Sequence, residues 1–348
     1  MAQLGHLALL LAFIVSSCAI TADILGKWRG SAGLIRSGRD ATIASFACLT
    51  VAVTILLIAL VGSDFSIAYV AQHTSNALAT SYKISALWAG AAGSLLLWLW
   101  MQAGFVVIVF GKCKGDQRAF CANARVVANL VCVFFLLVLT FRMNLFAVSE
   151  VAISDGAGLD LRLQHLVTAL HPPILFIGYA ACVVPFAWSF AWLKWDTAQG
   201  PAPLYKQIRN WILPAWLFLT IGAVLGAWLA YEQLGSEGHW LQDVAQNVSV
   251  MPWLPATALL YCSRIHKRDA AVAEWIVVLS LITFTSCVLA TFPGRPDMPA
   301  GARKLFIILL IHIWVLAAIS SWRRYRRSTQ GDPEQPDKAE KASNGDSK

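Results

Sequence analysis

The chain has 348 residues, of which 58% are hydrophobic and 13% charged, and its mean hydropathy is +0.62. This composition excludes a soluble globular domain. The net charge of +8 is dispersed over loops with no nucleic-acid-binding motif beside it, so a nucleic-acid partner is excluded as well. Because only helices satisfy their own backbone at this density of apolar residues, we predict an all-α polytopic membrane protein.

Apolar stretches long enough to cross a bilayer, about 20 residues each, recur along the whole chain. They predict about nine transmembrane helices, near residues 4–23, 42–62, 87–110, 121–141, 171–193, 211–230, 249–263, 272–291 and 304–322. These helices form one predicted transmembrane domain, residues 1–327. The remaining segment, 328–348, is rich in Asp, Glu, Pro, Lys and Ser, which predicts a disordered tail.

The positions of Lys and Arg predict how the helices are oriented, since short cytoplasmic loops retain basic residues. Alternate loops hold basic clusters, within residues 27–39, 112–125, 194–209, 264–268 and 323–327. The loop at 232–248 holds no basic residue. We therefore predict that the N-terminus and the 232–248 loop lie outside and that the C-terminus is cytoplasmic.

A polar and aromatic segment, residues 63–100, leads into the third predicted helix. Its sequence, SDFSIAYVAQHTSNALATSYKISALWAGAAGSLLLWLW, resembles the matching segment of the CcmF family, membrane haem-handling proteins that act as cytochrome c haem lyases. The positions that match the family pattern are Asp64, Phe65, Ser66, Tyr69, Val70, Ala71, Ser75, Asn76, Tyr82, Lys83, Trp88, Gly93, Ser94 and Trp98. The family has a glutamate where this chain has Ala92, so a charged residue is missing from the start of that helix.

A histidine followed by two prolines, His171, Pro172 and Pro173, begins the fifth predicted helix. Proline is tolerated in the first turn of a helix, so we expect the pair to fix the direction of the imidazole at the outer boundary. A neutral imidazole there can bind haem iron, or it can bond a neighbouring loop carbonyl. The resemblance implies the first role, because the family uses its matching histidine as an external axial ligand.

The stretch from Trp228 to Leu254, WLAYEQLGSEGHWLQDVAQNVSVMPWL, places polar and aromatic residues between two apolar segments. Rings at this depth form either an aromatic belt at the membrane surface or a shelf for a flat apolar ligand. The stretch is similar to the haem-binding signature of the CcmF family, although three tryptophans, a proline and a glutamate of that signature are replaced. The resemblance makes these residues candidates for haem contact: Trp228, His239, Trp240, Asp243 and Trp253.

Two further positions depart from the family pattern. Tyr261 stands where the family has a histidine that ligates a haem within the membrane, and Arg303 stands where its second external histidine falls. Tyrosinate can hold iron, but tyrosine is more often an anchor at the membrane surface. Arg303 suits a contact with a haem propionate. The second axial position of a haem on His171 would then be filled by His239, Met298, water or a partner.

The resemblance implies two alternative functions. In the first, the chain is a haem lyase component that transiently holds b-type haem and presents it to the CxxCH thiols of an apocytochrome c. It would act in the lipid of the bacterial inner membrane, with its haem-handling loops on the periplasmic side, beside a haem chaperone and other maturation subunits. In the second, the chain is a non-catalytic scaffold that pairs with a complete haem-handling protein. The resemblance covers only the amino-terminal part of a longer family, so we expect a separate subunit to supply the rest.

Overall fold

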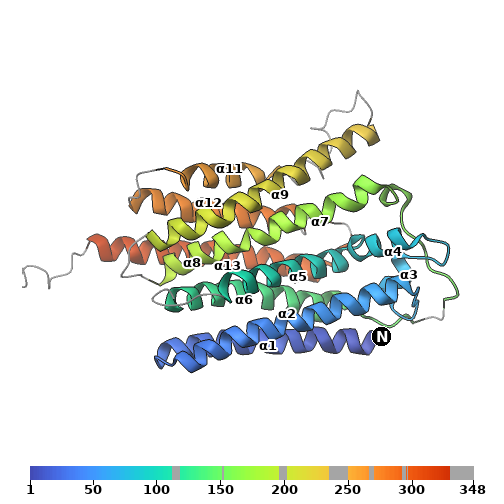
Figure 1. Cartoon of the computed structure of the whole chain (residues 1–348), viewed down its shortest axis with the longest axis horizontal. Coiled ribbons are helices and arrows are strands. Elements are labelled where there is room, and N and C mark those ends of the chain that lie inside the picture. Colours follow the sequence, from blue (N-terminus) through green and yellow to red (C-terminus); the bar gives the residue numbers. More distant parts are fainter. Residues whose placement is uncertain are drawn as a thin grey trace, which may run out of the picture.

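The computed structural model describes residues 1–111, 118–150, 153–195, 202–234, 250–265, 270–291, 295 and 297–329. In these ranges the apolar segments are helices that lie side by side in one bundle (Figure 1). The longer helices are α1 (Ala2–Trp28), α2 (Ala32–Val61), α5 (Ala91–Phe110), α6 (Arg118–Val138), α7 (Leu166–Ala181), α8 (Val183–Lys194), α9 (Ala202–Leu234), α11 (Trp253–Cys262), α12 (Ala270–Thr291) and α13 (Ala300–Thr329). The short ones are α3 (Ala68–His73), α4 (Thr80–Ser85), η1 (Ala86–Trp88), the π-helix η3 (Leu139–Met143) and η4 (Leu161–Leu163). The predicted all-α membrane class is confirmed.

Eight of the nine predicted spans correspond to described helical segments that are long and apolar enough to cross a membrane. The segment predicted at 249–263 differs, because its helix α11 has only 10 residues. At 1.5 Å per residue, a helix of that length reaches across roughly half of the hydrocarbon core. A turn at Met251 and Pro252 comes directly before α11. This turn interrupts the seventh predicted span, 249–263, within its described residues.

The two ends of the bundle carry different elements. The N-terminus, α3, α4, the start of α7 and the end of α9 lie at the right of Figure 1, whereas α13 ends at the left. We call the first end the outer end and the second the inner end, following the orientation that the basic residues predict. The assignment of one end to the outside stays a prediction.

Aromatic packing holds the middle of the bundle together. Trp98 of α5 is fully buried and meets Phe135 of α6 with ring centroids 5.0 Å apart. On its other side it meets Phe176 and Tyr179 of α7, at 6.5 and 5.8 Å. Rings of this size bury large apolar areas and pack with defined geometry. They therefore fix α7, which carries one candidate site residue, against α5 and α6.

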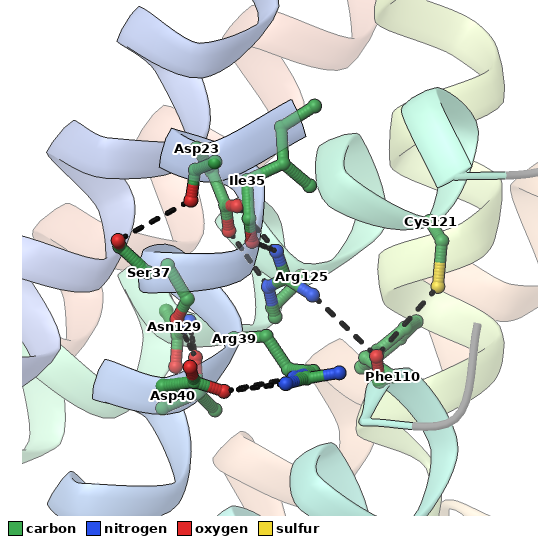
Figure 2. Close-up of polar contacts among 12 residues, drawn as sticks. Asp23, Ile35, Ser37, Arg39, Asp40, Phe110, Cys121, Arg125 and Asn129 are labelled. Carbon is green, nitrogen blue, oxygen red and sulfur yellow. Dashed lines mark hydrogen bonds and ion pairs between the residues drawn. The ribbon is translucent and has the colours of Figure 1, made fainter. Parts of the chain in front are cut away.

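A buried ion pair joins α1, α2 and α6 near the inner end. Arg125 donates from Nε to Asp23 Oδ2 at 2.7 Å and from Nη2 to both Asp23 Oδ1 and the Ile35 carbonyl. Its Nη1 reaches the Phe110 carbonyl at 3.5 Å. Figure 2 shows the guanidinium between these partners. A Cβ atom on Gly38 would clash with the Asp23 carboxylate, so glycine is needed there. We call Asp23, Gly38, Arg125 and the two carbonyls the inner cluster.

Candidate functional site

His171 lies inside α7. The sequence predicts that it begins a helix, but α7 starts at Leu166, so Pro172 and Pro173 are interior residues of the helix. That expectation was wrong because His165, with extended backbone, already serves as the N-cap. A proline inside a helix removes a backbone donor and leaves a carbonyl one turn earlier without its partner. The prolines therefore open the backbone beside His171, and they do not begin the helix.

The imidazole of His171 is buried, with 8% of the residue exposed. Its Nδ1 atom has no hydrogen-bond partner among the described residues. The ring lies against the backbone of Gly222 on α9. A buried polar nitrogen without a partner is costly, and it is uncommon in native proteins. His171 therefore has an available nitrogen near the outer part of the bundle.

Close packing of α7 on α9 sets the position of that imidazole. A Cβ atom on Gly222 would lie 2.7 Å from Leu175 Cδ1, and a Cβ atom on Gly178 would lie 3.0 Å from Leu219. At each of these two contacts, a glycine of one helix packs against a leucine of the other. Small residues allow this close approach in membranes. The approach brings the α9 backbone against His171.

The end of α9 and the start of α7 meet through polar groups at the outer end. Trp228 is exposed, and its Nε1 donates to Glu232 Oε1 at 2.7 Å. The other carboxylate oxygen of Glu232 lies 3.7 Å from His165 Nδ1. Sequence reasoning gave no role to His165 or to this link. The signal that could have found it is an acidic residue one turn after a tryptophan on one helix face.

Trp253 contacts α9 about two helical turns before Trp228. Its Nε1 donates to Thr220 Oγ1 at 2.9 Å, and Trp216 Nε1 donates to Thr257 Oγ1 at 2.8 Å. The two indole rings stack with centroids 6.3 Å apart. Thr220 is about four helical turns before the end of α9. Trp253 therefore belongs to a clamp between α9 and α11, and the structure does not bring it to the outer end.

Arg303 lies in the first turns of α13 and binds its own loop. Its Nη2 donates to the Arg295 carbonyl at 3.1 Å and lies 3.5 Å from the Met298 carbonyl, while Nε is buried with no partner among the described residues. Met298, the alternative axial ligand, is itself buried. The guanidinium thus holds the loop before α13 and keeps one donor free.

The start of α5 has a carboxylate, although Ala92 replaces the family's glutamate. Asp297 Oδ2 accepts from the Ala91 amide at 2.5 Å. Arg295 binds Asp297 and also donates to Ser94 Oγ and the Ala89 carbonyl, at 3.0 and 2.8 Å. Burial raises the pKa of Asp297, but the Arg295 guanidinium and the Ala91 amide outweigh that effect and hold the pKa below its usual range. A carboxylate from a distant loop thus occupies the helix start.

A small cavity lies beside this helix start. Its volume is about 270 Å³, and its lining includes Tyr69, His73, Gly90, Ala92 and Asp297. His73 stacks on Tyr69 and donates from Nδ1 to the Tyr69 carbonyl at 2.8 Å. Burial lowers the pKa of His73, so its ring is neutral at pH 7. The volume is below the range that holds drug-sized ligands, so a porphyrin does not fit here.

The remaining candidates are placed as follows. His239, Trp240 and Asp243 fall in residues 235–249, outside the described residues. Tyr261, near the inner end of α11, is 73% exposed on the outside of the described bundle. The structure therefore brings His171 and Trp228 to the outer parts of adjacent helices. Trp253 instead contacts Thr220 of α9, Tyr261 lies near the inner end of α11, and Arg303 binds the loop before α13.

Comparison with known proteins gives a consistent set of similarities. Residues 88–295 match the family described as Cytochrome C assembly protein. The cytochrome c-type biogenesis protein CcmF of Haemophilus influenzae is 35% identical over 299 residues, which cover 84% of this chain and 45% of that protein. The protein of the same name from Escherichia coli is 33% identical over 317 residues, 88% of this chain and 49% of that protein.

A solved structure, Cytochrome c Heme Lyase CcmF, superposes with a TM-score of 0.80 at 27% identity and covers 92% of this chain and 51% of that chain. The chain thus spans about half the length of the curated relatives and of the solved structure that it matches.

Proposed function

Because the chain belongs to the cytochrome c assembly protein family, we propose that it acts in cytochrome c maturation as a haem-handling membrane component. The membrane is the bacterial inner membrane, and the outer end faces the periplasm. The partners are apocytochrome c, a haem chaperone and other maturation subunits. The haem is b-type and is bound transiently.

The observation that carries this proposal is the free nitrogen of His171. Neutral imidazole is the usual axial ligand of haem iron in many proteins. His171 Nδ1 is buried with no partner among the described residues, which fits an atom reserved for a ligand. The bonded pair Trp228 and Glu232 lies farther along α9, toward the outer end. Its exposed indole offers an apolar edge to a flat ligand.

In this proposal the chain holds the haem and orients it. Bound haem would supply vinyl groups, across which the cysteine thiols of a CxxCH segment add to form thioethers. His171 would hold the haem iron. The close contact of α7 with α9 keeps the imidazole in one orientation and buries it away from water. Catalysis of this kind works by positioning the two reactants.

The alternative, a scaffold without haem, is favoured by two other residues. Arg303 donates from Nη2 to a carbonyl of its own loop. Tyr261 presents its phenol outward, on the outside of the described bundle. Neither side chain converges on His171 within the described part of the chain. A scaffold would use the outer end only to contact a complete haem-handling protein.

An absorbance spectrum of the purified protein separates the two functions. After expression with ample haem, the wild type is expected to show a Soret band. His171→Ala should abolish it because the iron loses its protein ligand. His165→Ala is the matched control, since it removes an exposed imidazole from the start of the same helix and should keep the band. No haem in the wild type would support the scaffold, whereas equal haem content in the wild type and the His171→Ala variant would show that His171 is not the ligand.

A further inference from the structure

His312 occupies an unusual place on α13. It lies within one residue of the midpoint of the span Ala300–Arg323, where the hydrocarbon is deepest. No other Asp, Glu, His, Lys or Arg of the described spans lies so near the middle of its helix. Its side chain is on the exposed surface of the bundle. Polar side chains at this depth normally face other protein groups.

A backbone hydrogen bond fixes which nitrogen of His312 faces outward. Its Nδ1 lies 2.8 Å from the Ile308 carbonyl, one turn earlier. A carbonyl can only accept, so Nδ1 carries the proton and Nε2 of the neutral ring is an acceptor. No described residue of another helix donates to that atom. An acceptor in hydrocarbon without a donor costs free energy.

The surroundings of His312 on α13 are apolar. Ile308, Val315, Leu316 and Ile319 share its face and are exposed. The buried side of the helix, with Leu310, Ile313 and Ala317, packs on the bundle. We call His312 with its four exposed neighbours the α13 face. The α13 face thus has a single hydrogen-bond acceptor surrounded by apolar side chains. A surface that complements it is also apolar and has a single hydrogen-bond donor.

We infer that the α13 face binds a transmembrane helix of another membrane protein, and that this helix carries a hydrogen-bond donor, such as Ser, Thr, Asn, Gln, Tyr or Trp, at mid-membrane depth. Hydrogen bonds of this kind join helices in membranes, where the hydrophobic effect gives no preference for helices over lipid. A second copy of this chain is a poor partner. A twofold contact would place two Nε2 acceptors against each other. The indole N–H of Trp314 could not donate to Nε2 in such a contact, because Trp314 projects from a different side of the helix.

Site-specific photocrosslinking in native membranes tests the inference. A photoreactive residue at Leu316, on the α13 face, is compared with one at Ile307, on another side of α13; the two positions are similarly exposed, 43% and 46%. The expected result is an adduct of one defined protein mass from position 316 and only lipid adducts from position 307. Lipid adducts alone from both positions, or an adduct of twice the mass of this chain, would overturn the inference.

Two substitutions show whether His312 is the reason for the contact. His312→Leu removes the acceptor and should lower the yield of the protein adduct about three- to tenfold. His312→Gln keeps an acceptor at similar reach and should keep the adduct. Equal yields in all three proteins, or loss in both variants, would overturn the role of the acceptor. His171→Ala should leave the adduct unchanged, so failure of the proposed haem function would not be confused with failure of this contact.

Discussion

The inner cluster and the outer part of α7 and α9 differ in whether their buried polar atoms have hydrogen-bond partners. In the inner cluster, Arg125 uses Nε, Nη1 and Nη2, and the Asp23 carboxylate has both oxygens bonded. In the outer part, His171 Nδ1 is buried with no partner among the described residues. A fully hydrogen-bonded buried network stabilises a fold, whereas a buried polar atom without a partner costs free energy. The difference is consistent with a structural role for the first region and with the ligand-binding role that we propose for His171.

Breaking the ion pair of the inner cluster should have the largest effect. Arg125→Leu leaves the Asp23 carboxylate buried without its partner, which costs about 3–5 kcal/mol of unfolding free energy. The expected result is poor accumulation of protein and a sharply lowered melting temperature in detergent. The double variant Asp23→Leu with Arg125→Leu should recover much of the loss, because no charge is then left unpaired. Equal loss in the single and double variants would mean that the pair acts through shape alone.

A smaller effect is expected at the glycine of the same cluster. Gly38→Ala adds a Cβ atom that clashes with the Asp23 carboxylate, and overpacking of this kind costs about 1–3 kcal/mol. Gly33→Ala on the same helix is the control, since the nearest atom to its added Cβ is Ser31 Oγ at 3.7 Å. The control should be neutral or slightly stabilising in a thermal melt. A melting temperature that falls equally in both variants would contradict the close contact.

At the outer end, Asp297→Asn should cost about 1 kcal/mol or less, because that carboxylate is 42% exposed and is screened by solvent. Its folded pKa is depressed, so its stabilisation is present above the unfolded value and is lost as the pH falls through the folded pKa. The wild type should therefore lose more stability between pH 6 and about pH 3 than the variant does. Identical pH profiles of melting temperature would show that Asp297 contributes no such linkage.

The two tryptophans should respond differently to loss of the indole donor, and the smallest change in stability is expected at Trp228. Trp253→Phe loses the hydrogen bond to Thr220 and should cost about 0.5–1.5 kcal/mol while leaving any Soret band intact. Trp228→Phe loses an exposed bond to Glu232 and should have almost no effect on the melt, but it should shift or weaken the band. The reverse result would place the ligand shelf in the clamp between α9 and α11.

Local pattern predicted the class and most of the spans, because the length of an apolar stretch alone decides whether it can cross a bilayer. It did not reveal the turn at Met251 and Pro252 before α11, because a count of apolar residues cannot recognise a turn. It failed at His171, where the family-like pair of prolines predicts the start of a helix that in fact begins earlier, at Leu166. Propensity alone did not show that packing on α9 carries the helix through those prolines.

By itself, the sequence determined the helical membrane class and singled out His171, because apolar length, Lys and Arg asymmetry and a short motif are all local properties. Only the tertiary structure decided which polar atoms are satisfied. Asp23 and Arg125, about 100 residues apart in the chain, complete each other. Asp297 places a carboxylate at the start of α5, where Ala92 has none. The Nδ1 atom of His171 is left without a hydrogen-bond partner among the described residues. Hydrogen bonds between distant segments depend on how helices pack, and no local pattern encodes that packing.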